Sequence, residues 1–150
     1  EDGLVVRAFL VDHSPIAPSL GYRVEFGGQI VALSGDTIDA PGYRALAQDA
    51  DVLVSEIIEL DATIQFACGF EGAGDMRNGK IFRDIRTYHV GVDAVAAAAA
   101  QADVGTLVLM HAVPVLPEQL RQSLFVDAIG QVYDGPIILA EDGTEVVLDL

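Results

Sequence analysis

The chain is poor in cysteine and in basic residues, and each shortage excludes a class of site. A single cysteine, Cys68, excludes an internal disulfide and any zinc site built from several thiolates. Only 8 residues are Lys or Arg against 23 Asp and Glu, and the resulting formal net charge of −15 disfavours a broad nucleic-acid-binding surface. No run of 18 apolar residues occurs, so the sequence predicts no membrane-spanning helix.

Apolar side chains are plentiful at 51% of the 150 residues, which predicts a folded domain with a substantial core. No repeat or low-complexity linker divides residues 1–150, so we expect a single domain. The chain begins abruptly with Glu-Asp-Gly, which is no signal peptide. We therefore expect a segment to be missing upstream, and we expect a cytoplasmic location unless a signal peptide was removed there.

Apolar runs and turn residues predict an α/β chain in which helices and strands alternate after residue 40. Gly27-Gly28 and Asp142-Gly143 are typical of hairpin turns. The first predicted strand reads as buried, and Asp39 is the expected N-cap of the first helix, with Pro41 in its first turn. The predicted strands are 3–11, 21–26, 29–34, 51–57, 106–110, 136–140 and 145–150. The predicted helices are 40–48, 91–103 and 117–133.

Residues 58–88 show no clear periodicity and predict a long loop with one helical turn. This segment holds four glycines, the one cysteine and half of all the Lys and Arg in the chain. Long loops in compact domains are usually functional or mobile. The basic residues of the segment are either partners for an anionic substrate or solvated side chains of a loop. They are Arg77, Lys80, Arg83 and Arg86.

Four side chains able to bind metal or move protons stand at the ends of predicted strands or just past them: His13, Asp36, Glu56 and His111. A third histidine, His89, precedes a predicted helix. In α/β sheets the carboxyl ends of strands collect the site residues, and imidazole and carboxylate are the usual zinc ligands where cysteine is absent. Taken singly, each residue is also explained as a hydrogen-bonded loop residue, a turn cap or a solvated charge. The residues alone leave both interpretations open.

A longer pattern runs through these residues. A His precedes a Gly-Tyr-Arg strand, and Ser-Gly-Asp-Thr, Asp-x-Leu-x-x-Glu, a helix-opening His and Leu-x-Leu-x-His follow in order over residues 9–114. The pattern resembles the C-terminal half of a metallo-β-lactamase-fold hydrolase of the ribonuclease Z and arylsulfatase-like branch. The tail "GPIILAEDGTEVVL" resembles the terminal hairpin of the same group. The resemblance implies that residues 1–150 are a single domain or half-domain of an αβ/βα sandwich.

The resemblance also implies roles for the five residues. His13 would bind a first metal, Asp36 would bridge two metals, and His111 would bind the second. Glu56 and His89 would form a catalytic pair, with His89 as proton donor. The implied cofactor is a pair of Zn²⁺ ions, with Mn²⁺ or Fe as alternatives. Gly35 would allow the tight turn at Asp36, and Thr37 is expected to hydrogen-bond the turn or the carboxylate.

One part of the pattern is missing. The family carries an H-x-H-x-D-H motif that supplies most of the metal ligands, and three histidines are too few to contain it. We expect a lost N-terminal half to carry this motif. A partner chain that supplies it, or a degenerate protein that binds no metal, are the alternatives. The chain by itself is expected to be inactive, because its ligands are too few for either metal.

The implied activity is hydrolysis of an ester, sulfate ester or phosphodiester by a metal-activated water. Ser55 stands where ribonuclease Z has His, Val90 follows the helix-opening His, and the net charge suits tRNA poorly. These departures favour a small anionic or ester substrate over nucleic acid. A non-catalytic binding or assembly module and a tRNA 3′-processing endonuclease are the alternatives. A homodimer is a further expectation, and a membrane is not an expected partner.

Overall fold

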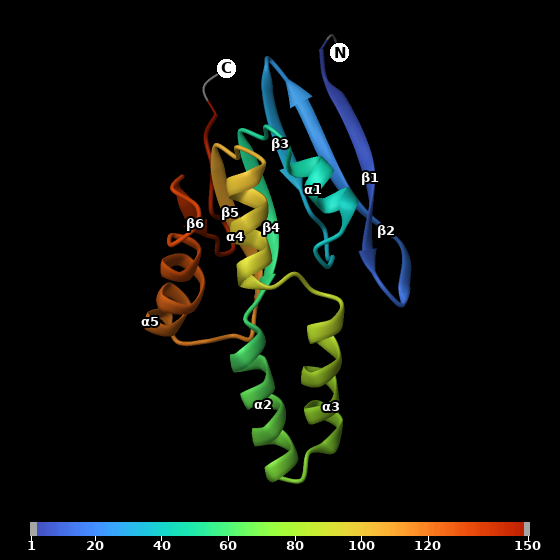
Figure 1. Ribbon diagram of the computed structural model, residues 1–150, viewed down its shortest axis with the longest axis vertical. Helices are drawn as coiled ribbons and strands as arrows, with labels where there is room; N and C mark the ends of the chain where they lie inside the picture. Colours follow the sequence, from blue (N-terminus) through green and yellow to red (C-terminus); the bar gives the residue numbers. More distant parts are fainter. Residues whose placement is uncertain (1–2, 149–150) are drawn as a thin grey trace.

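A six-stranded mixed sheet forms the centre of the computed structural model, which describes residues 3–148 (Figure 1). The strands lie in the sheet in the same order as in the sequence. The first three are antiparallel, and the third to the sixth are parallel. The strands are β1 (Val5–His13), β2 (Ile16–Phe26), β3 (Gln29–Leu33), β4 (Val52–Ile58), β5 (Thr106–Val113) and β6 (Ile137–Leu139).

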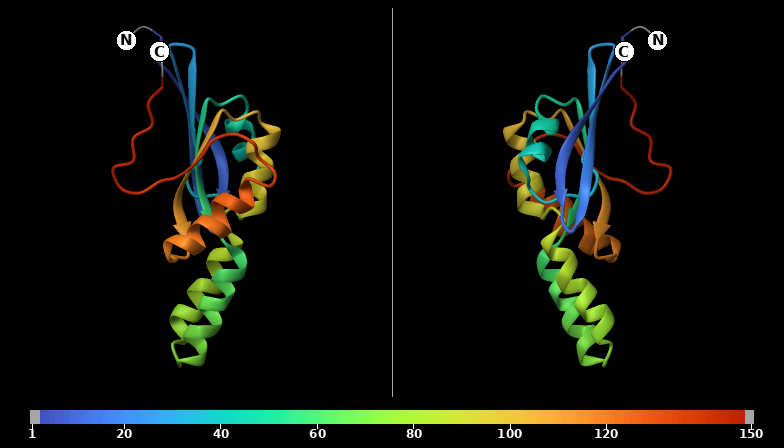
Figure 2. Two further views of the ribbon diagram at one scale, coloured as in Figure 1. Left: turned by 90° about the vertical axis from the view of Figure 1, so that its left-hand side faces the viewer. Right: turned by 90° about the vertical axis from the view of Figure 1, so that its right-hand side faces the viewer.

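Two helices, α1 (Pro41–Ala47) and α4 (Val92–Gln101), cover one face of the sheet (Figure 2). Tyr43 and Leu46 of α1 are fully buried in a core that also includes Leu53 of β4 and Leu107 of β5. A Cβ atom on Gly42 would lie 1.7 Å from the carbonyl oxygen of Leu10, so only glycine lets α1 approach β1 this closely. The core therefore lies between these helices and the sheet.

The opposite face of the antiparallel half of the sheet is apolar and open to solvent. Val6 pairs with Val24, Ala8 with Tyr22 and Leu10 with Leu20, which places these side chains on one face. Exposed apolar patches of this kind mark interaction surfaces. The exposed large side chains of this face are Val6, Leu10, Leu20, Tyr22 and Phe26.

Residues 58–88 differ most from the sequence prediction, because they form a helical hairpin and not a loop. We call residues 60–87 the arm: α2 (Leu60–Gly72), α3 (Met76–Asp84) and the 3₁₀ turn η1 (Ile85–Thr87). The arm projects from the carboxyl end of the sheet (Figures 1 and 2). Asp75 caps α3 by accepting a 3.1 Å hydrogen bond from the main-chain N–H of Asn78, and Glu59 caps α2 in the same way.

A small aromatic cluster joins the two helices of the arm. The ring of Phe82 on α3 lies 5.6 Å from that of Phe66 and 5.3 Å from that of Phe70, both on α2. The i, i+4 spacing of Phe66 and Phe70 and the two capping acids are the sequence signals that favoured helices here. The glycines of the segment outweighed them in the prediction. Gly72 and Gly74 lie at the end of α2, where glycine is tolerated, but Gly69 and Gly79 lie inside the helices.

The remaining differences lie at the edges of the sheet. β1 is an exposed edge strand and not a buried one, and β2 begins at Ile16, earlier than predicted. Asp39 does not cap α1, since it pairs with Arg44 at 2.6 Å and Ala40 occupies the cap position. A terminal hairpin is absent from the described residues, because β6 pairs in parallel with β5 and residues 141–148 form no strand. Residues 149–150 of the predicted last strand lie outside the described range.

The other predicted elements are confirmed. The Gly27-Gly28 turn joins β2 to β3, Pro41 opens α1, and α4 and β5 fall within two or three residues of their predicted bounds. The predicted helix 117–133 starts as α5 (Glu118–Arg121) and continues through the π-helical segment η2 (Gln122–Asp127). No helix in residues 3–148 has both the length and the apolar character needed to cross a bilayer.

We predict that the 150-residue chain, expressed by itself, binds the hydrophobic dye ANS through the open face of its sheet. The reason is that apolar side chains of β1 and β2 are exposed there. The double substitution Leu10→Lys and Tyr22→Lys should lower the ANS fluorescence by more than about half, since it places two charges on that face. Equal fluorescence from the wild-type chain and this variant, both folded by circular dichroism, would contradict the prediction.

Candidate metal and acid–base site

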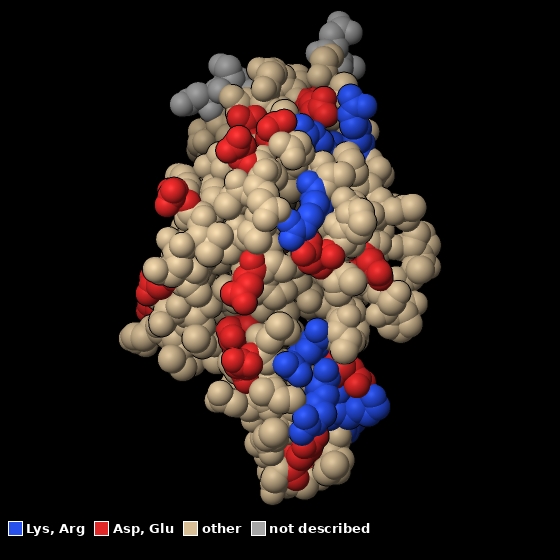
Figure 3. All heavy atoms as spheres, in the orientation of Figure 1, with Lys and Arg blue, Asp and Glu red and all other residues tan. Residues whose placement is uncertain are grey.

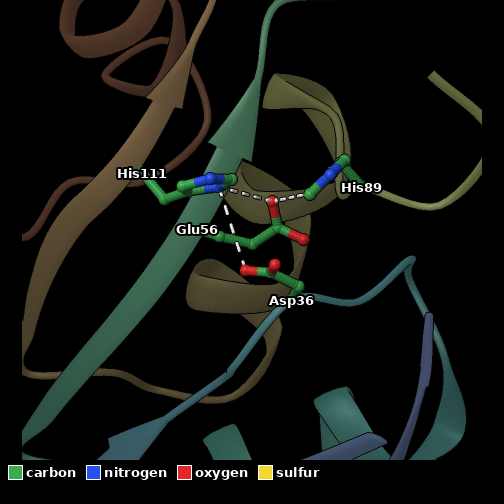
Figure 4. Close-up of side chains that lie close together, drawn as sticks. All are labelled: Asp36, Glu56, His89 and His111. Carbon is green, nitrogen blue, oxygen red and sulfur yellow. Dashed lines mark hydrogen bonds and ion pairs between the residues drawn. The ribbon is translucent and has the colours of Figure 1, made fainter. Parts of the chain in front are cut away.

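Four titratable side chains converge at the carboxyl end of the parallel strands (Figure 4). One ligand atom from each of Asp36, Glu56, His89 and His111 lies within 4.8 Å of the others. Asp36 follows β3, Glu56 lies in β4, His111 lies in β5, and His89 precedes α4. The structure therefore brings together four of the five residues that the sequence singled out.

The turn after β3 is held by main-chain hydrogen bonds, and within residues 3–148 none of the hydrogen bonds uses the carboxylate of Asp36. Gly35 has a φ of +60°, and a Cβ atom there would lie 2.7 Å from the carbonyl oxygen of Leu20. The main chain of the turn is fixed from two sides, because Ser19 Oγ donates to Asp36 O at 3.1 Å and Thr37 Oγ1 donates to Ile38 O at 2.8 Å. The carboxylate of Asp36 remains 42% exposed and faces the site.

Glu56 carries the most deeply buried carboxylate of the site, with no exposed surface. Its Oε1 accepts a 2.6 Å hydrogen bond from the main-chain N–H of Thr37, and its Oε2 lies 2.5 Å from Nδ1 of His89. A buried carboxylate is stable only when such donors replace its water. Thr37 thus positions the carboxylate of Glu56 through its main-chain N–H. Its side chain makes the turn hydrogen bond that the sequence predicted.

His89 is nearly buried, and its burial and its carboxylate neighbours shift the pKa of the imidazole in opposite directions. Burial lowers the pKa of the imidazole, whereas the hydrogen bond to Glu56 and the negative charges of Glu56 and Asp36 raise it. The raising effects prevail, so the pKa of His89 lies above its ordinary value. Since Nδ1 is bound to Glu56, Nε2 is the nitrogen left for another partner.

His111 reaches the site through an irregularity in β5. Met110 pairs with Glu56 and Ala112 with Ile57, which makes His111 the extra residue of a β-bulge. Its φ of +47° is in the left-handed region that non-glycine residues rarely adopt. The bulge turns the ring toward the site, where Nδ1 lies 3.8 Å from both Asp36 Oδ1 and Glu56 Oε2. Strain of this kind is typical of functional positions.

His13 lies beside the four-residue group and not within it. Its Nδ1 lies 2.7 Å from the main-chain oxygen of Tyr88, and its ring lies 4.9 Å from that of His89. A carbonyl oxygen can only accept, so Nδ1 carries the proton and Nε2 keeps its lone pair in the neutral ring. Metal-binding histidines usually have this second hydrogen bond.

Asp36 and His111 suit a divalent cation by donor type and by spacing. Among residues 3–148, neither side chain makes a hydrogen bond, and the 3.8 Å between them is close to the separation of about 3.4 Å for two ligands of a tetrahedral zinc. Glu56 suits a cation less well, because both of its oxygens are already bound. The residues present fit part of a metal site, with too few ligands to complete it.

Tyr43 and Ser55 form a buried support that sequence analysis missed. Tyr43 Oη lies 3.0 Å from Ser55 Oγ, which donates to the main-chain oxygen of Glu56 at 2.8 Å. Ser55 is thus the link between α1 and the strand end that carries the buried carboxylate. A tyrosine on the apolar face of this helix was the available signal, since a buried phenol needs a polar partner.

We predict that the usual stability order of alanine over glycine is reversed at position 111, in the bulge. At ordinary positions alanine is more stable than glycine, but at a positive φ glycine avoids the clash of Cβ. His111→Gly should therefore be more stable than His111→Ala by about 1 kcal/mol in the free energy of unfolding. Urea denaturation of the two metal-free variants measures the difference, and a more stable alanine variant would show that the bulge is absent.

Three curated relatives are ribonucleases Z. The chain is 39% identical to that of Mycobacterium marinum over 115 residues, which is 77% of this chain and 37% of the relative. It is 41% identical over 117 residues to that of Mycolicibacterium paratuberculosis, with the same coverage. A putative ribonuclease Z of Mycobacterium tuberculosis is 37% identical over 122 residues, which is 81% of this chain and 50% of the relative. The chain thus spans between a third and a half of their length.

Solved structures agree with this likeness at the level of the fold. The chain matches the short form of human tRNase Z with a TM-score of 0.60 and 21% identity, over 100% of this chain and 44% of the other. It matches the metallo-β-lactamase-fold protein YhfI of Bacillus subtilis with a TM-score of 0.64 and 17% identity, over 95% and 49%. Zn²⁺-bound PqqB of Methylobacterium extorquens gives 0.64 and 21%, over 99% and 52%.

The search of family models found no match to the chain. The relatives nevertheless agree with the family that the sequence pattern indicates, and the solved structures agree with the α/β fold. We conclude that the chain belongs to the ribonuclease Z family and has the metallo-β-lactamase fold.

Proposed function

We propose that the complete protein is a metal-dependent hydrolase that cleaves phosphodiester bonds, and that this chain is its C-terminal half. The observation that carries the proposal is the convergence of Asp36, Glu56, His89 and His111 within 4.8 Å of one another. Two carboxylates and two imidazoles at one point favour a metal and acid–base site over four separate structural roles. The similarity to ribonucleases Z supports the same reaction class.

In this proposal Asp36, His111 and His13 would hold the metal, and the carboxylate of Asp36 would be shared by two ions. The remaining ligands come from an H-x-H-x-D-H motif in the other part of the protein. A bound pair of divalent cations, Zn²⁺ or alternatively Mn²⁺ or Fe, would supply a water acidic enough to be hydroxide near neutral pH. The tautomer of His13 and the carboxylate of Asp36, which accepts no hydrogen bond within residues 3–148, support these assignments.

Glu56 and His89 act as a pair beside the metal ligands. Glu56 binds Nδ1 of His89 and so fixes the direction of the ring. The raised pKa of His89 keeps more of the imidazole protonated near neutral pH, and its Nε2 can then give a proton to the leaving oxygen. This role needs the buried hydrogen bond, because the same carboxylate both orients the ring and stabilises its charge.

The substrate class follows from the relatives more than from the charge of the chain. A net charge of −15 favoured a small ester or sulfate ester over nucleic acid in the sequence analysis. The curated relatives are ribonucleases Z, which favours an RNA phosphodiester instead. A non-catalytic module gains support only if the complete protein lacks the H-x-H-x-D-H motif. The cytoplasmic location and a homodimer stay predictions.

We predict that Asp36→Ala lowers the hydrolytic activity of the complete protein by more than about 100-fold and lowers its metal content. The physical reason is the loss of the anionic ligand that two cations need between them. Elemental analysis gives the metal content, and hydrolysis of bis-p-nitrophenyl phosphate gives the activity. The matched control is Asp39→Ala, which removes a surface carboxylate three residues away and should leave both quantities within about twofold. Unchanged metal content and activity in Asp36→Ala would refute the proposal.

We predict a different outcome for His89→Gln in the complete protein. Its kcat should fall by about 100-fold or more because the proton donor is lost, while the metal content stays that of the wild type. Parallel assays with p-nitrophenyl sulfate, p-nitrophenyl acetate and an RNA with a 3′ extension identify the bond that is cleaved. Loss of metal in this variant would instead make His89 a ligand.

A further inference from the structure

Positive charge is concentrated in the arm. Residues 60–87 contain four of the 8 basic residues and four acidic ones, so the arm is neutral. The other four basic and 19 acidic residues carry the whole net charge of −15. Figure 3 shows a group of Lys and Arg side chains over the arm, interspersed with Asp and Glu, and smaller blue groups among the acidic side chains of the rest of the visible surface.

The four basic residues recur at every third position, from the start of α3 to η1. Arg77, Lys80 and Arg83 belong to α3 and Arg86 to η1. The nine residue steps from Arg77 to Arg86 extend about 14 Å along a helix axis. The series ends three residues before His89, so it leads from the tip of the arm toward the site.

The four cations have different local partners. Arg83 binds Glu71 of α2 through two hydrogen bonds of 2.7 and 2.6 Å, which brace the arm. Lys80 pairs with Asp84 on the surface, and its side chain remains 74% exposed. Within residues 3–148 Arg77 makes no ion pair, and Arg86 donates from Nε to the main-chain oxygen of Leu60 at 3.1 Å. No carboxylate of the described residues therefore pairs with Arg77 or Arg86.

The linear spacing of these cations argues against a single small anion as their partner. A small anion is bound by cations that converge on one point, whereas these are strung along a helix. The three-residue spacing also turns the side chains around the helix axis, so that Arg77 and Lys80 are neighbours and Arg86 lies on another side. Neighbouring cations along a helix match the successive phosphates of a nucleic-acid strand. The acidic surface elsewhere repels such a strand and so restricts its approach to the arm.

We propose that the arm binds the phosphate backbone of an RNA strand through Arg77, Lys80 and Arg86, and so directs the strand toward the site. This inference rests on the proposed phosphodiester substrate. It identifies the surface that would favour an RNA strand with many phosphates over a small phosphodiester. Exposed ion pairs contribute little to stability, so Lys80 can exchange Asp84 for a phosphate. Arg83 keeps its structural role in bracing the two helices.

The test measures RNA binding to the complete protein in an Asp36→Ala background, where turnover is removed. The probe is a fluorescein-labelled single-stranded RNA of about 20 nucleotides, longer than a single site of this type needs. Arg77→Gln with Lys80→Gln should weaken binding by roughly tenfold near 0.1 M salt and reduce the slope of log affinity against log salt by about 1.4.

The matched control is Arg7→Gln with Arg121→Gln, which removes two cations from β1 and α5. Both are paired with surface glutamates, Glu25 at 3.1 Å and Glu141 at 3.0 Å. The control should bind RNA within about twofold of the parent protein, because neither residue lies on the arm. Equal weakening in the two double variants, or no weakening in the arm variant, would overturn the inference. Circular dichroism confirms that both variants are folded.

A competition experiment tests the need for successive phosphates. Unlabelled RNA should displace the probe, whereas inorganic phosphate at the same total phosphate concentration should not. Equal displacement by inorganic phosphate would overturn a strand-binding surface. The hydrolysis assay tests the proposed function separately. If the protein binds RNA through the arm but hydrolyses no phosphodiester, this inference is supported and the proposed function is refuted.

Discussion

The buried carboxylate of Glu56 is the group on which the site depends. It has no contact with water, so it is stable only because the main chain of Thr37 and the ring of His89 donate to its two oxygens. These two donors come from the turn after β3 and from the segment before α4. One buried charge thus holds three separate segments of the chain in fixed relative positions.

The parallel half of the sheet places the site, and local irregularities aim its side chains. β3, β4 and β5 end at one edge, which brings Asp36, Glu56 and His111 together although they are far apart in sequence. Gly35 and the bulge at His111 then depart from regular backbone and turn two of these side chains toward the third. The regular strands bring these three residues close together, and the irregular backbone at Gly35 and His111 orients the side chains.

Sequence reasoning could predict the elements in which apolar periodicity dominates, such as α4, β4 and β5. It could also predict that strand ends carry the site residues, because parallel strands end at a common edge. It failed for the arm, whose helices are stabilised by two capping acids and by contacts among Phe66, Phe70 and Phe82, and not by a buried stripe. It did not predict that His13 lies beside the four-residue group, where its ring is held by a hydrogen bond to the main chain of Tyr88.

The hydrogen bond between Glu56 and His89 also closes the base of the arm, because the arm begins four residues after the first and ends two residues before the second. The cost of closing a loop rises only slowly with its length. Helical turns can therefore be inserted or deleted near the tip, around Ala73 and Gly74, without moving the pair at the base. The length of the arm can therefore change without a change in the geometry of the site.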